Sequence, residues 1–318
     1  MPSSAVRTFT DPVEYFTGIR NLQIVGIVHR RGEFRAKSTR IDFHRLWMHR
    51  FDEDLPRIMK VTPSGKRALI IFATGVDCPA MQVNGTEISQ DQIVKLGLNW
   101  EWYIKSSAPY QWGTMSLTPE DLAAAAEAII GRELAPSTFP RSITPPALAL
   151  SRLRRLHEAA GDLARNAPDL LAKPEVAQAI EQALVETMVF SLADSSSDRV
   201  SHVEHNRARV MRRLEEVLVA TPDQPLYMAE LCARIGVSYW MLRDCCLHYL
   251  SMSPKRYLWL RRMHLARRAL RRANTERTTV TEIASDYGFW ELGRFSVAYR
   301  LLFGESPSTA LRRPPDRL

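Results

Sequence analysis

Two stretches in the last third of the chain decide its fold: Glu230-Leu-Cys-Ala-Arg-Ile-Gly236-Val and Glu282-Ile-Ala-Ser-Asp-Tyr-Gly288-Phe. Each stretch predicts a short helix, a glycine at a turn and an apolar residue after it. They lie 52 residues apart, and past the turn the offset becomes 53, so that Ser253-Pro254 matches Ser306-Pro307. A match of this length in both pattern and chemistry indicates an internal duplication.

Each copy has the residues that a helix-turn-helix needs. A small residue, Cys232 or Ala284, lets the two helices approach closely, and Gly236 or Gly288 supplies a turn conformation that a Cβ disfavours. We expect the following residues, spaced four apart in each second helix, to face the core: Leu242 and Cys246, and Phe295 and Tyr299. The residues between them then face outward, where the helix can enter a DNA major groove.

A long helix is predicted between the two units. Ser253 caps it, Pro254 occupies its first position, and the pattern continues to about Arg272. About 19 residues span roughly 28 Å. This length suits a rigid spacer that presents both recognition helices to grooves one DNA turn, about 34 Å, apart.

The repeat and the long helix carry a specific resemblance. The residues concerned are Val237-Ser238, Leu242, Ser253-Pro254-Lys-Arg-Tyr-Leu, Arg262, Ala266-Arg267, Leu270, Ile283-Ala284, Gly288-Phe289, Phe295, Tyr299, Phe303-Gly304 and Ser306-Pro307. From about Glu215 to Arg313 the chain resembles the AraC/XylS family of bacterial transcription regulators. The resemblance implies two helix-turn-helix units joined by one helix, an N-terminal sensory or oligomerising cupin-type barrel, and activation of transcription through RNA polymerase.

The position of each residue in the motif predicts the DNA contacts. Expected base contacts are Ser238, Tyr239, Trp240 and Arg243 in the first unit, and Trp290, Glu291, Gly293, Arg294 and Val297 in the second. Arg243 and Arg294 are the strongest candidates, because arginine bonds guanine O6 and N7 with two hydrogen bonds. Expected phosphate contacts are Lys255, Arg256, Arg300 and Arg312. Core packing for either tryptophan, and an internal partner for Asp244, remain open alternatives.

The charge distribution agrees with a nucleic-acid partner. Residues 200–318 contain 20 Lys and Arg against 12 Asp and Glu, whereas the first 199 residues contain 23 of each kind. All of the net charge of +8 therefore lies in the last third of the chain. A basic domain beside a neutral one favours a polyanion partner, namely double-stranded DNA.

The N-terminal part has the pattern of a β domain. Short strands are predicted from residues 21 to 28, 67 to 74, 81 to 88, 92 to 96, 100 to 105 and 110 to 117, with Asn84-Gly85 as a hairpin turn. We predict a multi-domain α and β fold: an N-terminal cupin-like β-barrel with a helical connector, and a C-terminal all-α bipartite helix-turn-helix domain. The expected boundaries are a tail at 1–20, a sensory domain at 21–118, a connector at 119–193, a linker at 194–205 and a DNA-binding domain at 206–313.

Helices are predicted in the connector near residues 147–166 and 173–193. The second places Val176, Ile180, Leu184 and Met188 along one stripe. This stripe packs on its own domain or forms a dimer seam, and we expect a homodimer.

No catalytic or metal site is expected. His29, His44 and His49 are scattered, without the clustered glutamate that a metal-dependent cupin needs, and the four cysteines lack zinc-ligand spacing. No cofactor is expected either. Aromatic residues concentrate on two neighbouring strands, and Trp100, Trp102 and Trp112 are candidates for an effector pocket or for ordinary core packing.

The sequence therefore predicts a DNA-binding regulator of transcription, which we expect to be an activator responding to a small molecule. The alternatives are a constitutive or architectural DNA-binding repressor, and a cupin-type enzyme fused to a DNA-binding tail. The first ten residues lack the apolar core of a secretory signal, and no apolar run of about 18 residues suggests a membrane span. We expect a cytoplasmic protein without a membrane partner.

Overall fold

The computed structural model describes residues 2–19, 22–30, 32–63, 66–75, 78–97, 101–134, 140–193, 202–221, 226–274 and 277–313. The chain divides into two compact units. Unit 1 comprises Met1–Val25 and Phe34–Arg199, and unit 2 comprises Gly26–Glu33 and Val200–Leu318. Within the described residues, no helix is both long enough and apolar enough to cross a membrane.

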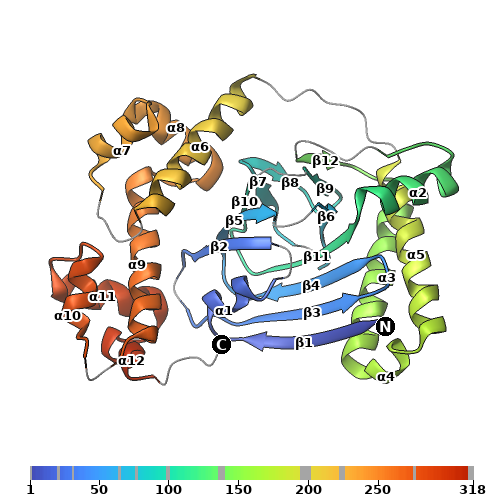
Figure 1. The fold of residues 1–318 in the computed structure, drawn as a ribbon, viewed down its shortest axis with the longest axis horizontal. Coiled ribbons are helices and arrows are strands. Elements are labelled where there is room, and N and C mark those ends of the chain that lie inside the picture. Colours follow the sequence, from blue (N-terminus) through green and yellow to red (C-terminus); the bar gives the residue numbers. More distant parts are fainter. Residues whose placement is uncertain are drawn as a thin grey trace. The chain divides into compact units, whose positions relative to one another are not determined.

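The strands form two antiparallel sheets (Figure 1). The 7-stranded sheet has the order β1 (Ser3–Phe9), β3 (Ala36–Asp42), β4 (Trp47–Glu53), β11 (Tyr110–Leu117), β6 (Ala68–Ala73), β9 (Ile93–Leu96) and β12 (Arg141–Ile143). The 5-stranded sheet has the order β2 (Leu22–Val28), β5 (Arg57–Pro63), β10 (Trp102–Lys105), β7 (Met81–Val83) and β8 (Thr86–Ile88). The predicted class of fold, a β domain followed by helices and a C-terminal helix-turn-helix domain, is confirmed.

The predicted hairpin is present between β7 and β8. Val83 pairs with Thr86, and both turn residues have positive φ, 50° at Asn84 and 82° at Gly85. Two positive φ angles are the signature of a tight turn whose twist matches that of the flanking strands.

Some predictions for the N-terminal part are wrong. Residues 1–20, predicted as a tail, contain β1 and the helix α1 (Pro12–Thr17), and Ser3 to Phe9 pair in register with Asp42 to Ala36. The sequence of β1 hides this strand, because only Phe9 of its residues is buried and the strand is defined by its pairing with β3. The segment predicted as a helical connector, 119–193, likewise contains a strand, β12, which pairs with β9.

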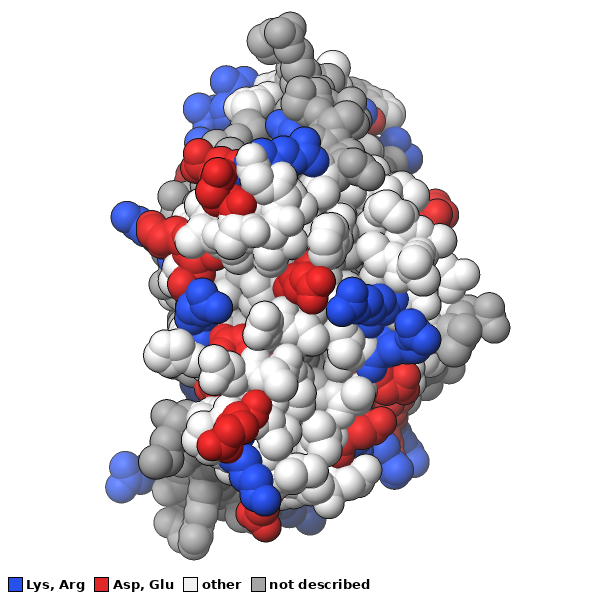
Figure 2. Space-filling model, turned by 90° about the vertical axis from the view of Figure 1, so that its right-hand side faces the viewer, with Lys and Arg blue, Asp and Glu red and all other residues white. Residues whose placement is uncertain are grey.

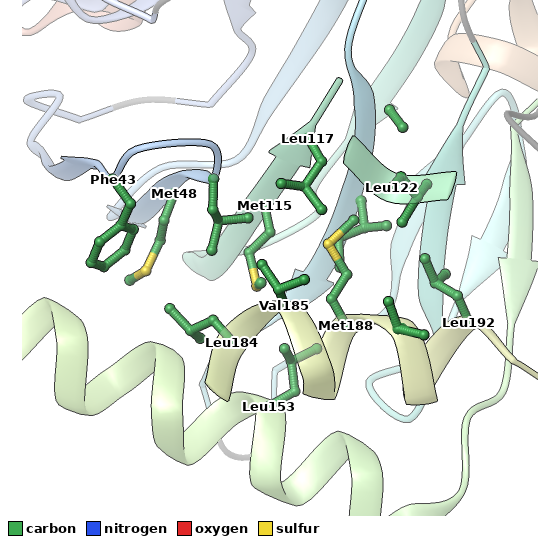
Figure 3. Close-up of a cluster of buried hydrophobic side chains, with 14 of the residues drawn as sticks. Phe43, Met48, Met115, Leu117, Leu122, Leu153, Leu184, Val185, Met188 and Leu192 are labelled. Atoms are coloured by element: carbon green, nitrogen blue, oxygen red, sulfur yellow. The ribbon is translucent and has the colours of Figure 1, made fainter. Parts of the chain in front are cut away.

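Helices cover one face of the 7-stranded sheet and enclose the main apolar core of unit 1 (Figure 3). They are α2 (Pro119–Ile130), α3 (Ala147–Asn166), α4 (Pro168–Leu171) and α5 (Pro174–Leu192). Met48 and Met115 from the sheet meet Leu184 and Met188 from α5 in this core. The apolar stripe of α5 therefore packs on its own domain, and Leu184 and Met188 are not available as a dimer seam.

Unit 2 contains the helices of the predicted duplication. They are α6 (His202–Ala220), α7 (Met228–Ile235), α8 (Tyr239–Leu250), α9 (Pro254–Arg272), α10 (Val280–Asp286), α11 (Leu292–Phe303) and α12 (Pro307–Arg312). Residues 202–205, predicted as the end of a linker, already belong to α6, whereas residues 194–201 lie outside the described part of the chain.

Candidate DNA-binding surface

The two helix-turn-helix units repeat their turn at the level of single hydrogen bonds. The backbone N–H of Val237 donates to the carbonyl of Cys232 at 3.1 Å, and that of Phe289 donates to the carbonyl of Ala284 at 2.9 Å. Gly236 and Gly288 have φ of 76° and 73°, a region in which only glycine is free of strain. The predicted turn geometry is confirmed in both units.

Each recognition helix is held by the predicted apolar residues. Leu242 and Cys246 of α8, and Phe295 and Tyr299 of α11, are all buried. Burial raises the pKa of the Cys246 thiol well above its usual range, so it acts as a small apolar side chain. These contacts fix the rotation of α8 and α11 and so decide which side chains face outward.

The long helix α9 joins the units as predicted. The Ser253 hydroxyl accepts from the backbone N–H of Arg256, and the helix runs for 19 residues, or roughly 28 Å. Its buried residues include Tyr257 and Leu260 in its first half and Leu270 near its end. A helix packed along its whole length is a stiff spacer between the two units.

Buried polar contacts tie α9 to its neighbours. Tyr257 donates its hydroxyl hydrogen to Glu215 Oε1 of α6 at 2.6 Å, and Arg261 Nη1 lies 3.4 Å from Glu215 Oε2. Beyond α11, Glu305 Oε1 lies 3.3 Å from Arg267 Nε. Buried carboxylates of this kind need partners, because an unpaired buried charge is costly. Arg261 and Arg267 are therefore engaged within the protein rather than free for DNA.

The first recognition helix exposes aromatic and basic side chains at its start. Trp240 is 72% exposed, which excludes the alternative that it packs in the core of this chain. The Arg243 guanidinium lies 5.8 Å from the centre of the Trp240 ring, and Tyr239 touches the same ring edge-on. Ser238 caps the helix by accepting from the N–H of Met241 at 3.2 Å.

The second recognition helix exposes a different set. Trp290 is 73% exposed, so core packing is excluded for it as well, and Val297 is 62% exposed. The side chain of Glu291 makes no cap hydrogen bond at the start of the helix. It pairs instead with Arg294, whose Nη1 lies 2.8 Å from Glu291 Oε2. A Cβ built on Gly293 meets no atom within 4 Å, so the backbone here faces open space.

Asp244 pairs within the protein, as one alternative predicted. Its Oδ2 accepts from Arg207 Nε at 3.1 Å and from Nη2 at 3.0 Å. Arg207, on α6, is a partner that sequence reasoning missed, because the pairing joins residues far apart in the chain. The pair cancels a negative charge on the outer face of α8.

The predicted phosphate contacts are exposed. They are Lys255, Arg256, Arg300 and Arg312. The Arg256 guanidinium lies 4.4 Å from the centre of the Trp259 ring. Neighbouring arginines of α9 differ in exposure. Arg268 and Arg272 are exposed and lie one turn apart, whereas Arg267 is buried. Arg268 and Arg272 are further basic candidates that the sequence did not single out from the other arginines of this helix.

The aromatic residues predicted for an effector pocket lie in unit 1. Trp102 on β10 and Trp112 on β11 are both 1% exposed, and they come from different sheets. Trp100 lies outside the described residues. The prediction that these residues contact an effector therefore stays a prediction.

A family model described as a helix-turn-helix domain matches residues 231–313. Together with the two repeated turns, this match defines the C-terminal part as a helix-turn-helix domain. The chain is 32% identical over 153 residues to the "Probable thc operon regulatory protein" of Rhodococcus erythropolis, which covers 48% of this chain and 46% of that protein. It is 30% identical over 130 residues to "XylDLEGF operon transcriptional activator 2" of Pseudomonas putida, which covers 40% of this chain and 80% of that protein.

The chain belongs to the AraC/XylS family of transcription regulators. Its match to the Rhodococcus protein spans less than half of that protein's length, and its match to "XylDLEGF operon transcriptional activator 1" of Pseudomonas putida spans 34% of that activator. Among solved structures, that of "the AraC-like transcriptional activator CuxR" aligns with 89% of this chain and 100% of its own. The sequence identity is 12% and the TM-score is 0.39.

Proposed function

We propose that this chain is a sequence-specific, effector-responsive activator of transcription that reads two successive major grooves with α8 and α11. The observation that carries the proposal is the outward-facing start of each recognition helix, where Trp240 and Trp290 are more than two-thirds exposed. An exposed indole at the start of a recognition helix suits contact with sugars or thymine methyl groups.

The proposed base readers are Ser238, Tyr239, Trp240 and Arg243 on one helix, and Trp290, Glu291, Gly293, Arg294 and Val297 on the other. Lys255, Arg256, Arg300 and Arg312 are proposed to hold phosphates. Arginines that are exposed and not buried in ion-pair networks retain the N–H donors that guanine or phosphate accepts. The basic charge of residues 200–318 supports the same partner, because neutralising phosphates releases counterions and drives binding.

The central experiment compares the wild type with an Arg243→Ala/Arg294→Ala variant on sheared genomic DNA of the source organism. We expect the wild type to retain fragments that share two elements about 10 base pairs apart. Each arginine removed should cost about 1–3 kcal/mol of binding free energy on those sites and should relax the base preference at one operator position. An Arg209→Ala/Arg212→Ala variant removes the same charge from α6 and serves as the control.

Two outcomes would contradict the proposal. If the variant binds the retained sites as tightly as the wild type does, the two arginines do not contact DNA. If the variant weakens binding equally on every sequence, they hold phosphates and do not read bases. The alternative of a constitutive or architectural repressor is distinguished from an effector-responsive activator by a different measurement. A small molecule that changes operator affinity saturably would favour the effector-responsive activator.

We propose further that the protein is a cytoplasmic homodimer that recruits RNA polymerase and has no catalytic activity. Figure 2 views the side on which α2, α3 and α5 lie, where acidic and basic side chains intermix and neither charge forms a patch. On these helices Leu148 is 78% exposed and Phe190 is 41% exposed. The ion pair between Arg152 and Glu186 shows that the two apolar residues lie at the same end of α3 and α5.

This exposed pair is our candidate for a dimer contact. Leu148→Glu/Phe190→Glu should shift sedimentation from dimer to monomer without changing the far-ultraviolet circular dichroism. A monomeric wild type would contradict the dimer proposal. Metal analysis of the purified protein, together with a hydrolase and oxygenase screen, tests the alternative of a fused cupin-type enzyme.

A further inference from the structure

The outward side of the recognition helix α8 is a single stripe of four exposed residues: Trp240, Arg243, Asp244 and Leu247. Positions three, four and seven residues apart lie on one face of a helix, and the buried residues of α8 occupy the opposite face. Of the four, Arg243 is a base and Asp244 is an acid, so their charges cancel. This recognition helix therefore brings no net positive charge to the face that we propose for DNA.

The second unit differs at the equivalent positions. At the offset of 53 residues, Val297 corresponds to Asp244, and Arg300 corresponds to Leu247. Arg300 is exposed in the last turn of α11, where we propose that it holds a phosphate. The side chain of Leu247 has no donor to offer in its place. A cation that serves the first unit in this way therefore has to come from another helix.

Helix α6 supplies such a cation. It packs against both α7 and α8 (Figure 1). Arg207 of α6 reaches the stripe, because its Nε and Nη2 donate to Asp244 Oδ2 at 3.1 and 3.0 Å. The side chain of Arg207 is 25% exposed, and that of Asp244 is 56% exposed. The guanidinium is thus held beside the stripe and still meets solvent.

Asp244 leaves most donors of this guanidinium unused. An arginine carries five N–H groups, and the carboxylate takes one from Nε and one from Nη2. Among the described residues, Nη1 of Arg207 has no hydrogen-bond partner. Nη1 and the second hydrogen of Nη2 form the edge turned away from Asp244. Two parallel donors on one guanidinium edge match two oxygens of a phosphate.

We propose that Arg207 holds a DNA phosphate at the border of the groove that α8 enters, and that Asp244 is the positioning residue that directs its guanidinium there. The proposal rests on the proposed function, because it adds a contact to the same DNA complex. Arg207 belongs to a helix outside the groove, so it meets the phosphates that line the groove rather than the base edges on its floor. The DNA-contact surface then extends beyond residues 231–313, which the family model matches.

The test measures DNA affinity and its salt dependence for the full chain and for an Arg207→Ala/Asp244→Ala variant. This double change keeps the net charge, and it removes an ion pair too exposed to contribute much to the stability of the fold. The matched control is Arg212→Ala/Glu216→Ala, which removes a second exposed ion pair of α6, with 3.6 Å between Arg212 Nε and Glu216 Oε1. Arg212 lies five positions after Arg207, or about 140° further round the helix.

Two duplexes are compared: a fragment retained from sheared genomic DNA and a duplex of unrelated sequence. We expect the Arg207→Ala/Asp244→Ala variant to bind both about 5- to 10-fold more weakly than the wild type at about 0.1 M salt. The slope of log affinity against log salt should fall in magnitude by about 1, because one phosphate contact is lost. The control variant should match the wild type in both measurements.

An unchanged affinity or an unchanged salt slope would overturn the proposal, because Arg207 would then only offset the charge of Asp244. A loss confined to the retained fragment, with relaxed preference at one base pair, would overturn it in favour of base reading by the pair.

The positioning role of Asp244 is tested by comparing Asp244→Asn with Asp244→Ala. Both substitutions remove the negative charge, but only asparagine keeps an oxygen that accepts from Arg207. We expect Asp244→Asn to bind DNA at least about threefold more tightly than Asp244→Ala and to keep the larger salt slope. Equal affinities and slopes would overturn the positioning role. This comparison also decides the question if the double variant does not fold.

Failure of this proposal is distinguishable from failure of the proposed function. If Arg243→Ala/Arg294→Ala retains the wild-type sequence preference while the Arg207 variants behave as expected, the proposed base readers are wrong and the phosphate contact stands. The reverse result defeats only the contact of Arg207. A wild type that binds neither duplex would overturn both proposals.

Discussion

Replacing Gly293 with alanine should strengthen the fold and weaken the complex with DNA. Gly293 is in the first turn of α11, is exposed and lacks a positive φ, and a Cβ there meets no atom within 4 Å. Alanine adopts this conformation without strain and restricts the unfolded chain, which is worth about 0.4–1 kcal/mol. If the backbone at Gly293 lies against base edges, the added methyl group holds the helix off the groove, and affinity falls by about 10-fold.

The assay is thermal unfolding of the full chain beside titration of an operator fragment recovered from genomic DNA. For a domain of this size, the gain in stability corresponds to a rise in Tm of about 1–4 °C. Thr309→Ala, an exposed substitution on α12, is the control for unspecific effects on DNA binding. Unchanged operator affinity would remove Gly293 from the contact surface, and a lower Tm would refute the reasoning about its backbone.

Three further changes have defined outcomes. Glu291→Ala should weaken operator binding by about 1–3 kcal/mol, because it removes a carboxylate proposed to accept from a base. Tighter binding in a filter assay would show instead that Glu291 only holds Arg294 in an exposed ion pair. Ser251→Gly should add about 1 kcal/mol to the free energy of unfolding, since Ser251 ends α8 with φ of 53°, and an unchanged urea midpoint would refute the assignment of strain. Burial lowers the pKa of His157 to about 3. Folding therefore favours the neutral imidazole, and stability is highest above the unfolded-state pKa of about 6.5 and falls as the pH drops from there toward 3. Between pH 7 and pH 5 the free energy of unfolding of the wild type, measured by urea titration, should fall by about 2 kcal/mol more than that of His157→Gln. Equal losses in the two proteins would contradict burial of a neutral imidazole.

The helix-turn-helix domain was predictable because its signals are local. Ser253 and Pro254 mark the start of α9 within one turn, and Gly236 marks the end of α7 by its own backbone conformation. The rotation of α8 followed from the spacing of Leu242 and Cys246, which are both buried. Each of these residues decides structure through neighbours a few positions away, so a single sequence is sufficient.

The β unit was less predictable because its strands are defined by distant partners. Residues 3–9 become a strand through pairing with residues 36–42, and only Phe9 among them is buried, so their own composition gives no amphipathic signal. Glu53 and Arg57 read as surface residues in sequence, yet both are fully buried because they neutralise each other. The ion pair between Arg207 and Asp244 was hidden because its partners are 37 residues apart in the chain.

The duplicated units have kept their turns and cores and have diverged on the surface proposed to face DNA. At the offset of 53 residues, Phe295 stands where Leu242 does, and both are buried. On the outer face, by contrast, Trp240 corresponds to Gly293, and Arg243 corresponds to Ser296 rather than to Arg294. Two recognition helices that offer different donors and apolar groups at equivalent positions cannot prefer the same bases. We therefore expect the operator recognised by one chain to contain two unlike elements, and a retained motif made of two identical elements would contradict this view of the surface.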